Sequence, residues 1–443
     1  MRSSIKNKVI WSIAYPIIFG NLAQTLITLT DTAFLGRVSP IALGASMMAG
    51  IYYYVFSTLA WGFSIGVQII VARRLGEGKL NRIGVIFEHG IVFVLLLSTG
   101  LFLIQHYFSD YLLEKVIQSP HIYAAAMEYM NYRHYGIIFV CFNFLFRALY
   151  IGLSNTKVIS FSTLLMAGVN IFLDYVLVFG KWGFPQMGVG GAALASVCAE
   201  LSALLFFIFY TLARLPLKTY ALFAFHKLEG WLMKSILKLA FPTMIQKLLS
   251  FGTWFIFFVL VEHMGELPIA ISGIIRSAYM LIMIPVFAFG ATANTLTSRL
   301  IGAGKQSEVM STILKTWKLS FICILPVLLC SIFFPHSILS IYTDDISLVT
   351  ASVPSLYIIC IASVSMSFGM TFFEAVSGTG NTIHALWLEF IVLLVYTFSV
   401  WFFAYKIGTR VEWVWTSEIT YGTIIGLVSL LYIRYAPWQK KKI

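Results

Sequence analysis

The sequence predicts an all-α polytopic membrane protein with twelve transmembrane helices in two pseudo-symmetric six-helix bundles. Of its 443 residues, 59% are hydrophobic and only 11% are charged, and the mean hydropathy is +0.88. Soluble domains contain about 25% charged residues, so this composition excludes a soluble protein. The apolar segments are continuous rather than alternating, which favours helices over a membrane barrel. The second half of the chain also repeats motifs of the first half.

Each spanning helix needs about 20 apolar residues, and the chain is long enough for about a dozen. The spans are expected at residues 11–36, 42–72, 84–106, 122–152, 158–180, 188–213, 234–262, 268–299, 310–334, 350–378, 383–405 and 411–435. They leave no room for a separate soluble domain. The first apolar run has no small-residue cleavage site, so no cleavable signal peptide is expected. The five Cys residues form no CxxC, which indicates neither a metal site nor a disulfide framework.

The net charge of +12 comes from Lys and Arg residues in short loops and tails, as in the positive-inside pattern of membrane proteins. Most fall on one side, including both ends of the chain (Arg2, Lys441 and Lys442). The opposite side has fewer: Arg37, Lys115, Arg133, Lys181, Lys406 and Arg410. This predicts that both termini are cytoplasmic and that the basic residues do not bind nucleic acid. The expected location is a bacterial inner membrane.

The repeat is visible in motifs that lie 226 residues apart. Pro16 corresponds to Pro242, the Arg-Arg-Leu-Gly-Glu-Gly-Lys turn at 73–79 corresponds to 299–305, and Asn155 corresponds to Asn381. We therefore predict an N-terminal bundle (1–214), a cytoplasmic linker (215–229) and a C-terminal bundle (230–443). Six spans per half make this a parallel repeat, an arrangement typical of alternating-access transporters.

The first span contains a carboxylate, Asp31, which shares one helix face with Gln24 and Thr28 at i, i+4 and i+7 spacing. A carboxylate inside hydrocarbon costs several kcal/mol unless it is paired, neutralised or hydrated. Such a residue is a functional candidate. The alternative is a buried Asp that only bonds a neighbouring helix.

Spans five and six add Asn170 with Asp174, and Ser196 with Glu200, each pair one helical turn apart. Counted from the outer ends of their spans, Asp31, Asp174 and Ser196 all lie about 8–12 Å deep. Carboxylate, carboxamide and hydroxyl oxygens suit a hard cation rather than a soft metal. Two close carboxylates are equally suited to sharing a proton.

The repeat provides an internal comparison for these acids. The residues 226 positions after Asp31, Asn170 and Asp174 are Phe257, Tyr396 and Val400. Because the scaffold accepts these residues in the second half, the acids point to function rather than folding.

The second half has charged residues of its own within the spans: Lys247, Arg276, Glu374 and Glu389. Three of them lie in the inner halves of their helices, so an ion pair is expected. They are interpreted as pairing or gating groups, with substrate binding as the alternative. The many aromatic residues could line a binding cleft or face lipid.

Other function classes lack their motifs. The sequence has no HExxH motif for an intramembrane metalloenzyme and no selectivity-filter-like loop for a channel. The glycine-containing turns at 75–79 and 301–305 lack the GxxxxGK[ST] spacing of a P-loop and are predicted to end helices. Neither an enzyme nor an ATP-driven pump is expected, and no cofactor is predicted apart from the cation or proton held by the acids.

Over nearly its whole length the sequence resembles the multidrug and toxic compound extrusion (MATE) transporters. The resemblance lies in Pro16 with the Asp-Thr-Ala-Phe-Leu-Gly motif at 31–36, in Asn170-Ile-Phe-Leu-Asp174-Tyr, in the segment 183–195, and in the repeated proline and Gly-Ala-Gly-Lys turn of the second half. It implies two bundles arranged in a V that export organic cations or other amphipathic drugs in exchange for Na⁺ or H⁺.

The resemblance also implies roles for individual residues. The family's cation site corresponds to Asp31, Asn170 and Asp174, with Ser196 where a Thr is usual. Pro16 corresponds to the proline at which the first helix is proposed to bend. Some branches carry further carboxylates at positions that are Ser250 and Met366 here, so a second cation site is not predicted from the family pattern.

An alternative within the same superfamily is a flippase for lipid-linked saccharides. Such a flippase would need a strongly cationic cleft for the phosphate groups of its substrate. The few Lys and Arg residues within the spans weigh against it. The expected partners are small-molecule substrates and the lipid bilayer, and the expected state is a monomer.

Overall fold

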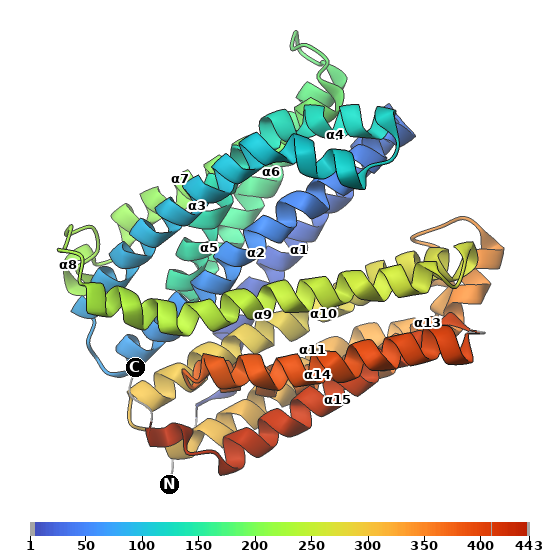
Figure 1. Cartoon of the computed structure of the whole chain (residues 1–443). Helices are drawn as coiled ribbons and strands as arrows, with labels where there is room; N and C mark the ends of the chain where they lie inside the picture. Colours follow the sequence, from blue (N-terminus) through green and yellow to red (C-terminus); the bar gives the residue numbers. More distant parts are fainter. Residues whose placement is uncertain (1–4, 409, 441–443) are drawn as a thin grey trace. The chain divides into compact units, whose positions relative to one another are not determined.

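The computed structural model describes residues 5–408 and 410–440, so Arg2, Lys441 and Lys442 lie outside the described residues. The described ranges are helical almost throughout (Figure 1). The first half contains α1 (Asn7–Val38), α2 (Pro40–Gly76), α3 (Asn81–Val116), α4 (Pro120–Arg133), α5 (Gly136–Gly152), α6 (Lys157–Phe179), α7 (Gly188–Arg214) and the short α8 (Leu217–Tyr220). The second half contains α9 (Gly230–Glu262), α10 (Glu266–Gly302), η1 (Gln306–Glu308), α11 (Val309–Phe333), α12 (Pro335–Leu339), α13 (Ile346–Gly378), α14 (Thr382–Phe402), η2 (Phe403–Ile407), α15 (Val411–Tyr435) and η3 (Trp438–Lys440).

Eleven helices in the described ranges are long and apolar enough to span a membrane, and α4 with α5 supplies a twelfth span when counted together. The predicted all-α membrane fold is thereby confirmed. The prediction of one helix over 122–152 was wrong in detail, because α4 and α5 are bent by 56°. At the bend, backbone N–H groups donate to carbonyl groups only three residues earlier. Tyr135 donates to Tyr132, and Ile137 donates to His134. This tighter spacing interrupts the α-helical ladder.

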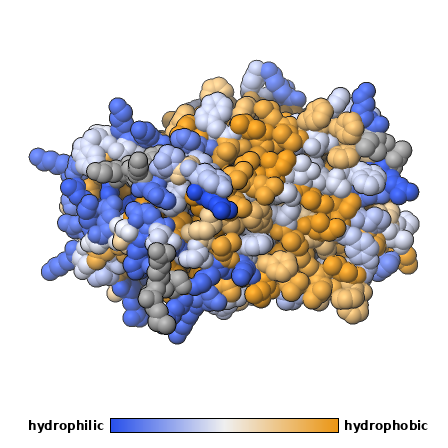
Figure 2. All heavy atoms as spheres, turned by 90° about the horizontal axis from the view of Figure 1, so that it is seen from below, coloured by the Kyte–Doolittle hydropathy of each residue, from blue (hydrophilic) through white to orange (hydrophobic). Residues whose placement is uncertain are grey.

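Exposed apolar side chains fit a lipid environment. Leu96, Phe209 and Phe398 are each more than 60% exposed. The face in Figure 2 presents broad hydrophobic areas, with hydrophilic side chains gathered mainly at one end. A soluble monomer rarely exposes apolar patches of this extent. The protein is therefore an integral membrane protein.

Contacts divide the chain into two compact units. The N-terminal unit comprises Phe19–Val71 and Lys79–Met244, and the C-terminal unit comprises Met1–Ile18, Ala72–Gly78 and Ile245–Ile443. Helices α1, α2 and α9 thus contribute to both units. The units are defined by contacts and not by the repeat, so the sequence halves 1–214 and 230–443 stay a prediction.

Each unit is built around its own central helix. In the N-terminal unit, α7 packs against α4, α5 and α6, and α3 packs against α5. In the C-terminal unit, α13 packs against α10, α11 and α15. The core of the C-terminal unit includes the fully buried rings of Phe257 and Trp415, whose centroids are 4.8 Å apart.

The linker is held to the N-terminal unit by α3. The Glu88 carboxylate accepts hydrogen bonds from the backbone N–H groups of Phe225 (3.0 Å) and His226 (2.9 Å). The backbone N–H of Glu229 donates to His89 Nε2 at 2.8 Å. These bonds satisfy backbone groups that have no helical partner in this segment.

Within the C-terminal unit, repeat partners contact one another where α2 and α10 end. A Cβ atom on Gly76 would lie 2.1 Å from the carbonyl oxygen of Arg299, and a Cβ on Gly302 would lie 2.2 Å from that of Arg73. Only glycine permits this approach of two helix backbones. Gly78 and Gly304 then adopt φ values of +71° and +70° in the turns that follow, which confirms the predicted helix ends.

We expect Gly76→Ala and Gly302→Ala each to destabilise the protein by about 1–3 kcal/mol, because the new methyl group pushes two backbones apart. The measurement is the midpoint of heat unfolding of the purified protein in detergent. Gly100→Ala on α3 is the matched control, because a Cβ there meets nothing within 4 Å. An unchanged midpoint for both crossing variants would contradict the close packing.

Candidate functional site

Three of the predicted ligands meet in the N-terminal unit. Asn170 and Asp174 lie one turn apart on α6, which packs against α7, and both are fully buried. Asp31 lies on α1 and is partly exposed, although its Oδ1 atom is buried. The Asp31 carboxyl lies next to the side chains of both Asp174 and Asn170. The sequence spacing therefore predicted a cluster that the fold assembles.

The polar atoms of this cluster lack hydrogen-bond partners. Both carboxylate oxygens of Asp174, both amide atoms of Asn170 and Oδ1 of Asp31 are buried without one among the described residues. Ionised carboxylates only accept hydrogen bonds, so two of them cannot satisfy each other. Such a pair requires a proton or a cation between its oxygens. The donor set fits a hard monovalent cation equally well.

The other residues predicted for this site differ in their placement. Gln24 and Thr28 are exposed on α1, where the Thr28 hydroxyl donates to the Gln24 carbonyl at 3.4 Å. Ser196 is half-buried on α7, one turn before Glu200, and stays a predicted ligand. Pro16 lies inside α1, which continues through it.

Glu200 has a partner that the sequence analysis misplaced. Arg133 was expected on the outer surface, but it is buried and binds Glu200 through two hydrogen bonds, of 2.7 Å and 2.6 Å. The Tyr53 ring lies under the guanidinium at 3.7 Å, and the Asn143 amide donates to the Glu200 backbone carbonyl at 2.9 Å. Arg133 is the last residue of α4, directly before the bend, and the structure places it between Tyr53 and Glu200. Its position inside an apolar span was a signal that could have revealed it.

One expected ion pair is confirmed in the C-terminal unit. Lys247 on α9 lies 3.6 Å from Glu374 on α13, and Asn294 donates to the same carboxylate at 3.2 Å. Glu389 instead accepts hydrogen bonds from Ser250 (2.5 Å) and Tyr421 (3.2 Å). These contacts join helices that are far apart in the sequence.

Arg276 is the remaining predicted charge of the second half. It is partly buried on α10, and its guanidinium lies 5.6 Å from the centre of the Phe258 ring. This distance is typical of a cation–π contact.

Sequence reasoning missed a further buried acid, Glu418 on α15. It accepts hydrogen bonds from the hydroxyls of Tyr396 (2.7 Å) and Tyr279 (2.9 Å). Tyr396 is the repeat partner of Asn170, and its ring stacks on Phe257, the partner of Asp31, with centroids 6.5 Å apart. The second half thus fills the equivalent place with aromatic rings beside one hydrogen-bonded acid. The location of Glu418 inside a span was the available signal.

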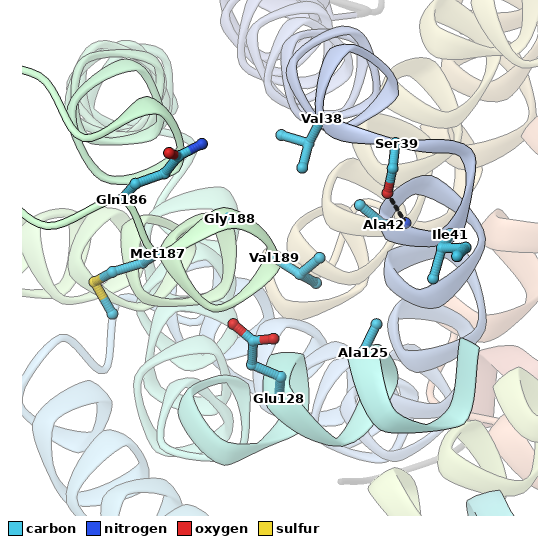
Figure 3. A pocket seen from close by; sticks show the side chains of 10 residues that line it. All are labelled: Val38, Ser39, Ile41, Ala42, Ala125, Glu128, Gln186, Met187, Gly188 and Val189. Carbon is cyan, nitrogen blue, oxygen red and sulfur yellow. Dashed lines mark hydrogen bonds between the residues drawn. The ribbon is translucent and has the colours of Figure 1, made fainter. Parts of the chain in front are cut away.

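An open pocket of about 330 Å³ lies elsewhere in the N-terminal unit (Figure 3). It is lined by the α1–α2 corner, by α4 and by the start of α7. The carboxylate of Glu128 points into it from α4, and Val38 and Val189 face each other across it. Asp31, Asn170 and Asp174 are not part of its lining. The pocket is therefore separate from the acidic cluster.

Comparisons with known proteins agree on one family. The MatE family model matches residues 16–176 and 242–402, one copy in each half. The probable multidrug resistance protein NorM of Thermotoga maritima is 25% identical, and the match covers 98% of this chain and 94% of that protein. NorM of Bacillus subtilis is 24% identical, with 98% and 96% covered.

Solved structures show the same fold. A crystal structure of MATE in complex with MaL6 has a TM-score of 0.88 at 20% identity, covering 97% of this chain and 95% of that one. A MOP superfamily transporter from Pyrococcus furiosus, with a binding pocket of reverse polarity, also has a TM-score of 0.88 at 20% identity, with 98% and 97% covered.

The paired charges predict a strong coupling between Arg133 and Glu200. Arg133→Gln and Glu200→Gln should each lower the midpoint of heat unfolding, because removing one member of a buried pair costs about 3–5 kcal/mol. The double variant should lose less than the sum of the two, with a coupling of about 0.5–3 kcal/mol. Strictly additive losses would contradict a direct pair.

Proposed function

The chain belongs to the MatE family, and we propose that it is a cation-coupled antiporter that exports organic cations or other amphipathic drugs by alternating access. Members of this family are transporters and not enzymes. The relatives named NorM are described as multidrug resistance proteins, which supports drug efflux as the transported process. Either Na⁺ or H⁺ is proposed as the coupling ion. The proposed location is the bacterial inner membrane, with both termini in the cytoplasm.

The observation that carries the proposal is an acid pair whose buried oxygens have no hydrogen-bond donors among the described residues. Asp31 and Asp174 adjoin each other in the N-terminal unit, and the Asp174 carboxylate has no hydrogen-bond partner among the described residues. An ionised pair in this place is costly, and one bound cation or proton removes much of that cost. Occupancy of the site therefore changes the stability of its surroundings.

An antiporter requires the loaded and the empty site to favour different conformations. Asp31 and Asp174 would hold Na⁺ or one proton, with the Asn170 carbonyl oxygen and the Ser196 hydroxyl as further ligands of Na⁺. The bound ion neutralises charge. A conformation that keeps α1 against α6 is then favoured when the site is loaded and disfavoured when it is empty. A ligand shifts such an equilibrium by its difference in affinity for the two states.

The alternative flippase would need free basic groups for the phosphates of a lipid-linked saccharide. In the C-terminal unit Lys247 is paired with Glu374, 3.6 Å away. The other acids within these spans, Glu389 and Glu418, are buried and accept hydrogen bonds from tyrosine hydroxyls. These contacts support the antiporter as the first proposal.

Asp31→Asn and Asp174→Asn should each abolish cation-driven drug efflux while the protein still inserts and folds. The amide cannot take up a proton or carry the charge that binds Na⁺. The measurement is drug resistance, together with ethidium efflux, in cells that express equal amounts of each variant. Asp344→Asn, at an exposed position outside the spans, is the control and should retain activity. Full resistance in cells carrying either site variant would reject the assignment of the site.

Purified protein in proteoliposomes identifies the coupling ion. Ethidium transport is measured under an imposed Na⁺ gradient and, separately, under an imposed pH gradient. Transport by the wild type under one gradient, and its loss in Asp31→Asn, is expected. Transport under neither gradient would contradict antiport of organic cations and move the flippase to first place.

A further inference from the structure

Arg147 is a charged residue within a spanning helix that no acid neutralises. It lies on α5, where its Nη2 donates to the side-chain oxygen of Asn21 on α1 at 3.1 Å. Among residues 5–408 and 410–440, this amide oxygen is its only hydrogen-bond partner, and no Asp or Glu forms an ion pair with it. An arginine side chain stays protonated in proteins, so the position carries a positive charge.

The contact with Asn21 places this charge far from the ends of α1. Asn21 lies about 21 Å along the helix from its start at Asn7. Arg147 itself is only partly exposed. The guanidinium is therefore not at a helix end, where a long basic side chain reaches the lipid headgroups. A charge at this depth is costly, and such residues face the interior of a bundle or a water-filled path.

The repeat shows the same place with its charge cancelled. The residue 226 positions after Asn21 is Lys247, and Lys247 on α9 pairs with Glu374 on α13 at 3.6 Å. In the first half, α1 and α5 meet instead through a neutral amide and Arg147. The repeat partner of Arg147 itself is the buried Phe373. The scaffold therefore does not require an arginine here, and the first half leaves a positive charge uncancelled.

The surface next to Arg147 combines polar groups with aromatic rings. On α1, one turn beyond Asn21, Gln24 is exposed. On α5, one turn before Arg147, the ring of Phe144 stacks on Trp61 of α2 with centroids 6.5 Å apart. The Trp61 side is 36% exposed, and all of these residues belong to the N-terminal unit. The surface thus offers ring faces for an apolar group beside a guanidinium with unused N–H donors.

We propose that Arg147 binds the carboxylate of amphoteric substrates, which carry a carboxylate as well as a cationic group. The proposal rests on the proposed drug efflux and narrows its substrate class. A planar guanidinium holds a carboxylate through two parallel hydrogen bonds. Asn21 holds one side of the guanidinium and leaves its remaining donors for the substrate. The bound carboxylate supplies the negative charge that Glu374 supplies to Lys247 in the second half.

A carboxylate fits this place better than the phosphate groups of a lipid-linked saccharide. Of the two arginines on α4 and α5, Arg133 is already bound to Glu200 by two hydrogen bonds. Arg147 is then the basic group that remains for a ligand. A single guanidinium neutralises one carboxylate, whereas a diphosphate carries more negative charge than one arginine balances.

Arg147→Gln should weaken the binding of a carboxylate-bearing substrate about tenfold, because a hydrogen-bonded charge partner is lost. The matched probes are rhodamine B, a cationic dye with a free carboxylate, and its ethyl ester, in which the carboxylate is blocked. The ester should bind the wild type and Arg147→Gln equally well. Arg147→Lys keeps the charge without the planar fork, so its affinity for rhodamine B should lie between the two.

Asn21→Asp tests the same site with the arginine intact. The new carboxylate should pair with Arg147, as Glu374 pairs with Lys247, and so exclude the carboxylate of the substrate. Binding of rhodamine B should again fall about tenfold, with the ester unaffected. An arginine with a purely structural role would gain an ion-pair partner in this variant, and dye binding would not change.

The measurement is the dissociation constant of each dye, from fluorescence polarisation with the full-length protein in detergent and protein-free micelles as the blank. Lys181→Gln, an exposed charge outside the spans, is the control and should bind both dyes as the wild type does. The midpoint of heat unfolding shows whether each variant is folded. Where Arg147→Gln does not fold, Arg147→Lys and Asn21→Asp carry the test. Benzoate and a polyprenyl phosphate are added as competitors, and benzoate should displace rhodamine B.

Unchanged affinity for rhodamine B in Arg147→Gln and Asn21→Asp would overturn the proposal, as would an equal loss for both dyes. Displacement of rhodamine B by the polyprenyl phosphate but not by benzoate would also overturn it, in favour of phosphate binding. Failure of the proposed function looks different. Proteoliposomes would then transport neither dye under a Na⁺ or pH gradient, while the binding of rhodamine B would still depend on Arg147.

Discussion

The N-terminal unit is subject to one electrostatic constraint, which is that a fully buried carboxylate lies beside a second, partly exposed one. Asp174 is fully buried, adjoins Asp31, and has no hydrogen-bond donor among the described residues. An ionised pair in such a place is costly, and a proton or a cation removes much of that cost. The proposed antiport uses this difference between the loaded and the empty site.

The two halves of the chain show how such a site is added to a duplicated scaffold. The second half fills the places of Asp31 and Asn170 with the stacked rings of Phe257 and Tyr396. It also keeps α13 continuous where the first half breaks between α4 and α5. Its own buried acids, Glu389 and Glu418, are satisfied largely by hydroxyl groups. Because the second half folds without these polar residues, the fold itself does not require them in the first half.

Much of the candidate site was predictable because helical spacing and depth follow from sequence alone. Asp31 and Asp174 were placed at one depth, with Asn170 one turn from Asp174, and the structure brings these three side chains together. The same reasoning predicted an ion pair among Lys247, Glu374 and Glu389, and the structure pairs Lys247 with Glu374. Arg133 was misassigned because a bend in an apolar segment has no simple sequence pattern. Glu418 was overlooked although it lies inside a predicted span.

The sequence by itself determined the membrane-spanning helices, since the bilayer leaves backbone groups no partners except those within a helix. It also determined the repeat and the acids that occur within apolar segments. Only the tertiary structure decided which charges are paired. Arg133 and Glu200 are 67 residues apart, and their contact depends on the bend after α4 and on the missing side chain of Gly136. Such pairings follow from how helices pack, and helix packing depends on many weak contacts between distant residues that no local pattern encodes.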